Sequence, residues 1–151
     1  MILNRFGRTV EPVEMYLFDT DVITNIFKPY PSEMLIGKLS RLEQRDQYIS
    51  TITILEIVYG AAKSDRPDYH LKNLEEILLP SVNIAGFDTK AAFICGHLRA
   101  NLEKQGRTLS LADMEIAAIA MANDFTLITG NTKHFARING LKLENWLEPE
   151  K

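Results

Sequence analysis

The sequence has 151 residues, of which 46% are apolar and 25% charged, and this is the composition of a single globular domain that can bury its own core. Cys95 is the only cysteine, which excludes an internal disulfide, and no apolar run reaches the roughly 18 residues that a membrane span requires. The net charge of −3 excludes a uniformly basic nucleic-acid binder but leaves room for a local basic stripe.

Residues 1–14 contain Gly7 and Pro12 and have no clean hydrophobic period, so we expect them to form a mobile N-terminal extension. They also lack the apolar core of a secretory signal peptide. Residues 15–151 are predicted to form one domain. We therefore expect a cytoplasmic protein with no membrane partner.

Short apolar runs alternate with amphipathic segments along this domain. The runs predict strands at residues 15–18, 48–51, 82–87, 126–129 and 141–144. Helical spacing predicts helices at 22–27, 33–42, 53–64, 68–79, 89–105 and 114–123, and a short turn or helix at 131–136. Ser32 and Asp88 are the expected caps of two helices, and Gly106 is an expected terminator. This alternation predicts an α/β fold in three layers, α/β/α, with a central parallel sheet of about five strands.

The first predicted strand stops abruptly at an acid. Met15–Phe18 is a continuous apolar run, as in strands that are buried on both faces, and Asp19 follows it directly. Ligands of open α/β sheets bind at the carboxyl ends of the strands, so Asp19 is well placed for chemistry. Asp is also a good N-cap, and the sequence equally allows Asp19 to cap the helix that follows.

Other polar residues are expected near the same edge of the predicted sheet. Glu56 lies one turn into the helix after the second strand, Asp113 opens an alanine-rich helix, and Asn131 and His134 follow the fourth strand. All of them lie at one edge if the sheet is parallel. Carboxylates gathered there raise one another's pKa unless a cation neutralises them, and Mg²⁺ is the expected cation because it prefers oxygen ligands.

Two of these acids also have a structural explanation. Thr53-x-x-Glu56 and Ser110-x-x-Asp113 both match the capping box, in which the acid bonds back to the N–H of the capping residue. Three acids at one sheet edge nevertheless favour a metal site for the set. The sequence has no Walker A motif, no dinucleotide-binding glycine pattern and no zinc-binding spacing of cysteine and histidine.

Five segments, taken together, resemble a known family. They are Leu17-Phe18-Asp19-Thr20-Asp21-Val22, Thr53-x-x-Glu56-Ile57-x-Tyr59-Gly60, Ala112-Asp113-x-x-Ile116-Ala117-Ala118-x-Ala120, Thr129-x-Asn131-Thr132-x-His134-Phe135 and Gly140-Leu141-x-x-Glu144-Asn145-Trp146. In this order and spacing, over residues 15 to 147, they resemble the PIN-domain ribonucleases of the VapC toxin type.

The resemblance implies the toxin of a type II toxin–antitoxin system. Such a toxin is a metal-dependent endoribonuclease, usually a homodimer, and is silenced by a cognate VapB-type antitoxin whose tail fills the acidic site. The resemblance also implies that Asp19, Glu56 and Asp113 bind Mg²⁺ or Mn²⁺ and catalyse the hydrolysis of RNA, with Thr20 and Asn131 in support. The implied substrate is a structured RNA such as a tRNA or a ribosomal RNA loop.

The sequence departs from the family pattern at two positions, and two alternatives stay open. Asp21 stands where asparagine is common, and His134 stands where many members have a fourth acid, which leaves the number of metal ions open. Asp19-x-Asp21 is also similar to the start of a haloacid-dehalogenase-type phosphatase, although the acid pair of that family is missing after the fourth strand. The missing fourth acid slightly favours a PIN-like module that binds RNA or a partner without cutting.

Overall fold

The computed structural model describes residues 2–10 and 14–148. The predicted extension, 1–14, and the predicted domain, 15–151, therefore each lie partly outside the described residues, at 1 and 11–13 and at 149–151.

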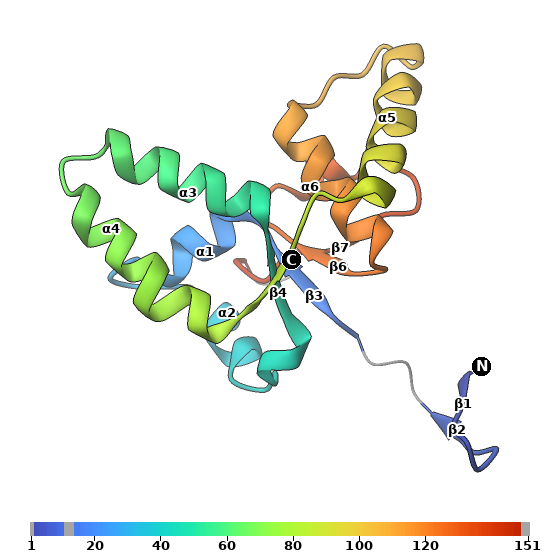
Figure 1. The fold of residues 1–151 in the computed structure, drawn as a ribbon, viewed down its shortest axis with the longest axis horizontal. Helices are drawn as coiled ribbons and strands as arrows, with labels where there is room; N and C mark the ends of the chain where they lie inside the picture. The colour runs from blue at the N-terminus through green and yellow to red at the C-terminus, as the bar shows by residue number, and fades with distance from the viewer. Residues whose placement is uncertain (1, 11–13, 149–151) are drawn as a thin grey trace.

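Five parallel strands form the centre of the molecule (Figure 1). They are β3 (Tyr16–Phe18), β4 (Gln47–Ser50), β5 (Asn83–Ala85), β6 (Thr126–Ile128) and β7 (Lys142–Glu144). Their order across the sheet is β5-β4-β3-β6-β7, and every neighbouring pair is parallel. The predicted α/β fold with a parallel sheet of about five strands is confirmed.

Helices cover both faces of this sheet (Figure 1). One layer contains α1 (Thr20–Ile26), α2 (Glu33–Leu39), α3 (Thr51–Lys63) and α4 (Pro67–Asn73), which continues as the π-helical turn η2 (Leu74–Leu78) and the 3-10 turn η3 (Leu79–Ser81). The other layer contains α5 (Thr89–Lys104) and α6 (Leu111–Ala122). A 3-10 turn, η1 (Gln44–Asp46), precedes β4, and the short α7 (Thr132–Phe135) follows β6. No helix of the described ranges is long and apolar enough to cross a membrane.

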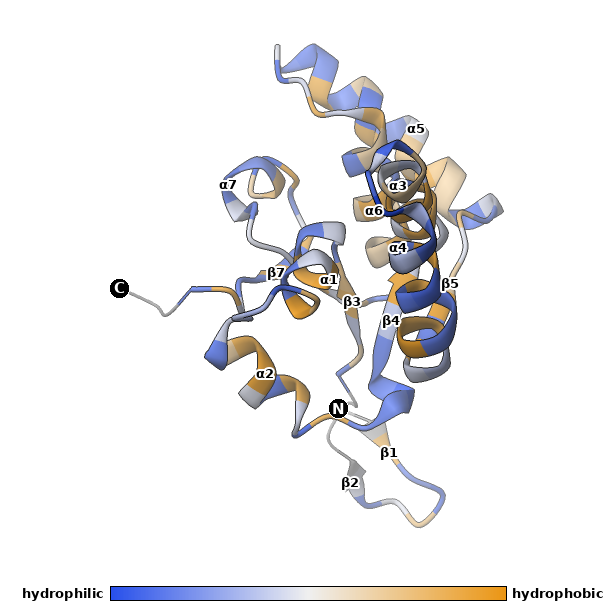
Figure 2. Cartoon of the chain, turned by 90° about the vertical axis from the view of Figure 1, so that its left-hand side faces the viewer, coloured by the Kyte–Doolittle hydropathy of each residue, from blue (hydrophilic) through white to orange (hydrophobic). Residues whose placement is uncertain are grey.

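The strands are buried on both faces because successive side chains point to opposite sides of a sheet. Leu17 and Leu127 belong to the core cluster beneath α5 and α6, whereas the next residues, Phe18 and Ile128, belong to the cluster beneath α1, α2 and η2. Figure 2 shows hydrophobic residues along β3 and along much of α2. The two clusters confirm the predicted three-layer arrangement.

Local hydrogen bonds fix several helix ends. Ser32 and Asp88 cap α2 and α5, because each side chain accepts a hydrogen bond from the third N–H after it (3.3 and 2.9 Å). After α5, Gly106 has a φ of +67°, and the N–H groups of Gly106 and Arg107 donate back to carbonyls of the last helical turn (3.0 and 2.9 Å). The two predicted caps and the predicted terminator are confirmed.

Some predicted helix boundaries were wrong. The first helix begins at Thr20 rather than residue 22, because Asp19 caps it. The third begins at Thr51, because the cap is Ser50 rather than Thr53. The helix predicted over 33–42 ends at Leu39, and the one predicted over 68–79 is α-helical only to Asn73.

Residues 2–10 form a hairpin that was not expected from the sequence. β1 (Ile2–Leu3) and β2 (Thr9–Val10) pair antiparallel in a sheet of their own. The Asn4 side chain accepts hydrogen bonds from two N–H groups of the turn, in which Gly7 has a φ of +71°. Strands of two residues are too short to show a hydrophobic period, which is why no sequence pattern indicated them.

Candidate active site

The carboxyl ends of β3 and β6 meet at one edge of the sheet, and backbone bonds fix the residues that follow them. The Asp19 N–H donates to the Ile128 carbonyl (2.9 Å), which extends the pairing of β3 with β6. Directly after β6, the Thr129 N–H donates to the Glu144 carbonyl of β7 (3.1 Å). Asp19 and Thr129 are therefore held on rigid strand ends.

Asp19 is only 7% exposed, and both of its carboxylate oxygens accept hydrogen bonds. Oδ1 accepts from the Thr20 N–H (2.8 Å), and Oδ2 accepts from the Thr129 hydroxyl (2.8 Å). The first bond makes Asp19 the N-cap of α1, and the second fixes it against β6. Capping a helix and contributing to a site are therefore compatible for this side chain.

The Asp19 carboxylate lies in an unfavourable electrostatic environment. Burial is the main cause that raises its pKa to about 6, and the charges of Asp21 and Asp113 also raise it, against hydrogen bonds from Thr129 and Thr20 that lower it. Burial and the charge of Asp113 likewise raise the pKa of Asp21. The three carboxylates are close enough to repel one another, and a cation among them would relieve that repulsion.

Glu56 reaches the site from α3 through a hydroxyl group. The Thr20 hydroxyl donates to Oε1 of Glu56 (2.7 Å) and lies 3.2 Å from the Thr53 hydroxyl. The capping box that the Thr53–Glu56 spacing allows does not form, because Ser50 caps α3 and Thr53 is already inside the helix. Glu56 is therefore oriented toward the residue next to Asp19.

Asp113 lies in the first turn of α6. Its N–H donates to the Ser110 hydroxyl (3.1 Å), which is one half of the predicted capping box. The carboxylate of Asp113 accepts no hydrogen bond from any residue of the described ranges, so the other half does not form. That carboxylate is therefore available to a ligand.

The side chains of Asn131 and His134 are exposed, and neither makes a hydrogen bond or an ion pair with another described residue. Asn131 contributes through its backbone, because its N–H donates to the Thr129 hydroxyl (3.0 Å) that in turn donates to Asp19. The predicted support of the metal site by the Asn131 side chain stays a prediction.

Asp21 and Thr129 hold the site together, although the sequence analysis did not assign them to it. The Gly130 N–H donates to Oδ2 of Asp21 (2.9 Å), whereas Oδ1 is buried and has no hydrogen-bond partner among the described residues. Gly130 fits because a Cβ there would lie 2.8 Å from both Asp21 Oδ2 and Leu147 Cδ1. The sequence contains a signal for each of these two residues. Asp21 closely follows Asp19, and Thr129 opens the segment that contains Asn131.

The chemistry of these side chains fits a hard divalent cation, which prefers carboxylate and hydroxyl oxygens. The unbonded carboxylate of Asp113 and the unpartnered Oδ1 of Asp21 are free to contribute. No three acidic, histidine or cysteine side chains of the described ranges already stand in a metal-binding arrangement. Asp19 is bonded to Thr129 and Glu56 to Thr20, so a cation has to compete with these hydroxyls.

The sequence pattern of the PIN domain family matches residues 16–141. The tRNA(fMet)-specific endonuclease VapC of Shigella flexneri is 31% identical over 131 residues, which cover 87% of this chain and 97% of that protein. Ribonuclease VapC2 of Haemophilus influenzae is 33% identical over 134 residues, which cover 87% of this chain and 98% of that protein. The chain belongs to the PIN-domain family, as a VapC-type member.

The fold of this VapC-type chain agrees with that assignment. It superimposes on a chain in the crystal structure of VapBC2 from Rickettsia felis, bound to a DNA fragment from their promoter, with a TM-score of 0.80 and 33% identity. The match covers 87% of this chain and 98% of that chain. The resemblance found in the sequence is confirmed, and the phosphatase alternative has no support. PIN-domain ribonucleases generally depend on a divalent metal.

Gly130→Ala should destabilise the VapC-type fold by about 1–2 kcal/mol, because the new methyl group displaces the Asp21 carboxylate from the residue 130 N–H. Gly96→Ala is the matched control, since Gly96 lies within α5 with open space around it and should gain about 0.5–1 kcal/mol. Urea denaturation of both variants measures the effect. Equal stability of the two variants would contradict the close contact.

Asp113→Asn should stabilise the metal-free protein at neutral pH. Asp19 binds its proton more tightly in the folded protein than in the unfolded chain, because its pKa is about 6 instead of 3.8. The folded protein therefore loses stability as the pH rises from about 4 to about 6, by up to about 3 kcal/mol from this group. Removing the charge of Asp113 reduces that cost. Asp65→Asn is the control, because it removes the same charge from an exposed loop.

Urea denaturation in the presence of a chelator, at about pH 4 and about pH 7, tests this expectation. The advantage of Asp113→Asn over wild type should grow with pH, and that of Asp65→Asn should not. An Asp113→Asn advantage that is the same at both pH values would show that the carboxylates do not repel one another.

Proposed function

We propose that this VapC-type chain is an endoribonuclease that hydrolyses RNA phosphodiester bonds with a divalent cation, Mg²⁺ or Mn²⁺. Asp19, Asp113 and Glu56 would hold the cation, and Thr20 would keep Glu56 in place. The observation that carries the proposal is the gathering of Asp19, Asp21 and Asp113 at the carboxyl edge of the sheet, where burial, and to a smaller extent the charges of Asp21 and Asp113, raise the pKa of Asp19. The repulsion among these carboxylates has no structural benefit, whereas it prepares a site for a cation.

The chain's own residues do three things in this reaction. A divalent cation, when bound, would supply positive charge beside the phosphate and acidify a water molecule. Asp19 stays in one orientation because two hydrogen bonds fix its oxygens, Thr20 orients Glu56, and Asp113 keeps an unbonded carboxylate ready. A covalent intermediate is not needed, and Cys95 is buried in the core under α5 and α6.

A binding module that holds RNA without cutting it is the second candidate. The missing fourth acid favours it, because His134 stands where many members of the family have an acid. The two candidates differ in one measurable property, which is RNA cleavage that depends on an added divalent cation.

Asp113→Asn should abolish RNA cleavage, because it removes a carboxylate that would hold the cation, and it should leave the fold intact, because that carboxylate accepts no hydrogen bond from the described residues. Unfractionated tRNA is the first substrate to test, since the Shigella flexneri relative is a tRNA(fMet)-specific endonuclease. Cleavage should require Mg²⁺ or Mn²⁺, stop with chelator, and persist in Asp65→Asn. Circular dichroism checks the fold of each variant. Full activity of Asp113→Asn would refute the assignment, and binding of tRNA without any cleavage would favour the binding module.

We also propose that a VapB-type antitoxin is the protein partner, since the similar structures include VapBC complexes. A pocket of about 410 Å³ between α1, α3 and α4 supports this, because it opens beside Thr20 and Glu56 and is lined mainly by apolar side chains such as Ile23, Ile57 and Leu74. An antitoxin segment seated there would reach the acidic site. The predicted homodimer stays a prediction, which light scattering of the isolated chain would test.

Expression of the chain alone should inhibit growth, and co-expression of the neighbouring antitoxin gene should relieve the inhibition. Tyr69→Ala should weaken that relief, because Tyr69 lines the pocket and is 49% exposed. Tyr30→Ala is the matched control, since Tyr30 is 93% exposed and lies outside the pocket lining. Co-purification of antitoxin with each variant gives the direct readout. Equal co-purification with both variants would place the antitoxin elsewhere.

A further inference from the structure

A second hollow, of about 460 Å³, lies between the loop after α5 and the helix α7. It is lined by Gly106, Arg107, Thr108, Lys133, Ala136 and Arg137. Three of these six residues are cationic and none is acidic, although the whole chain has a net charge of −3. We call this surface the basic hollow.

The three cations are not neutralised by the protein itself. The ion pairs found in the described ranges join Arg45, Arg99 and Lys142 to acids, and none includes Arg107, Lys133 or Arg137. All three side chains are exposed. Like charges held together without a counter-charge repel one another, so the basic hollow favours an anionic ligand.

The backbone around the basic hollow is fixed. The Arg107 N–H donates to the Leu102 carbonyl (2.9 Å) at the end of α5, and the left-handed Gly106 sets the direction in which the chain leaves the helix. One Nη atom of Arg137 donates to the Thr108 carbonyl (3.1 Å), which ties the end of α7 to this loop. The cations therefore project from a rigid frame that two separate segments build.

Both of those segments continue directly into the acidic site. Thr108 is five residues before Asp113, a stretch that can span at most about 18 Å. Lys133 is two residues after Asn131, whose N–H supports the Thr129–Asp19 bond. The basic hollow therefore lies within the reach of a few nucleotides from the carboxylates.

We propose that Arg107, Lys133 and Arg137 bind the phosphodiester backbone of the RNA substrate next to the acidic site. The proposal rests on the proposed ribonuclease function. The carboxylates of the acidic cluster repel the phosphates of an approaching RNA. Cationic side chains beside that cluster lower the electrostatic free energy that is needed to bring the RNA there. Contacts to phosphate carry no base preference, and the basic hollow therefore positions RNA rather than selecting its sequence.

RNA binding without cleavage gives the cleanest test. Asp113→Asn serves as the background, and fluorescence anisotropy with labelled, unfractionated tRNA measures the dissociation constant over a range of salt concentrations. Lys133→Gln and Arg107→Gln should each raise the dissociation constant about threefold. The double variant should raise it about tenfold and reduce the salt slope by about 0.7 for each phosphate that is no longer neutralised.

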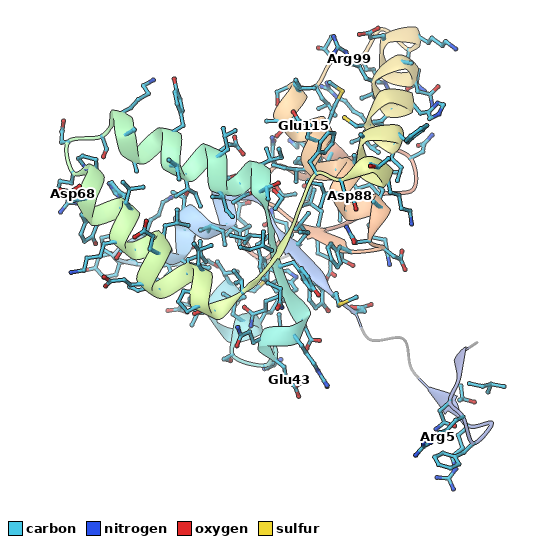
Figure 3. All side chains as sticks on the ribbon, in the orientation of Figure 1. Arg5, Glu43, Asp68, Asp88, Arg99 and Glu115 are labelled. Atoms are coloured by element: carbon cyan, nitrogen blue, oxygen red, sulfur yellow. The ribbon has the colours of Figure 1, made fainter. Side chains whose placement is uncertain are left out.

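Lys90→Gln is the matched control, because it also removes one exposed positive charge from the α5 region. Figure 3 shows Asp88 and Arg99 toward opposite ends of this helix, and Lys90 lies at the Asp88 end, about 20 Å along α5 from the basic hollow. It should leave affinity and salt slope unchanged. Thermal unfolding shows whether each variant folds, which is expected because the side chains of Arg107, Lys133 and Lys90 make no hydrogen bond or ion pair among the described residues.

Failure of this proposal differs from failure of the proposed function. If wild type cleaves tRNA but the Gln variants bind it as tightly as the Asp113→Asn background, the basic hollow does not bind RNA and the ribonuclease function stands. If the variants lose antitoxin binding and keep tRNA affinity, the ligand is an acidic protein segment and the proposal is refuted. Weaker tRNA binding with a smaller salt slope, together with cleavage of tRNA by wild type, supports the proposal. The same binding result without any cleavage would show that the basic hollow binds RNA and that the ribonuclease function is wrong.

Discussion

The site depends on one unfavourable arrangement, in which the sheet buries a carboxylate at its carboxyl edge and places other carboxylates close enough to repel it. Asp19 is nearly buried, and the charges of Asp21 and Asp113 add to the desolvation that raises its pKa. The fold tolerates this cost because β3 is central and paired on both sides, so the end of the strand cannot move to relieve it.

The same contacts hold the fold and the site. Asp19 caps α1 and also accepts the Thr129 hydroxyl, and Thr20 begins α1 and also orients Glu56. Gly130 leaves room for Asp21 to bind its backbone, which links α1 to the loop after β6. A substitution of any of these residues therefore changes the stability of the fold and the positions of the carboxylates together. Matched controls are needed to separate the two effects.

Charge is divided over the surface in a way that suits a polyanionic ligand. The acidic cluster attracts cations and repels phosphate, and the basic hollow beside it attracts phosphate. A net charge of −3 conceals this division, because net charge sums over the whole chain. An acidic protein can in this way bind RNA at one edge while the rest of its surface repels it.

The sequence by itself determined the α/β class, the five strands, the helix caps Ser32 and Asp88, and the position of Asp19 directly after a buried strand. These features depend on local patterns, such as apolar runs, capping residues and strand–helix alternation. Tertiary structure alone decided the Thr129–Asp19 bond, the Gly130–Asp21 contact and the basic hollow, because each joins residues that lie far apart in the chain. The strand order β5-β4-β3-β6-β7 decides which residues meet in these contacts, because it brings β6 next to β3. No local sequence pattern contains this order.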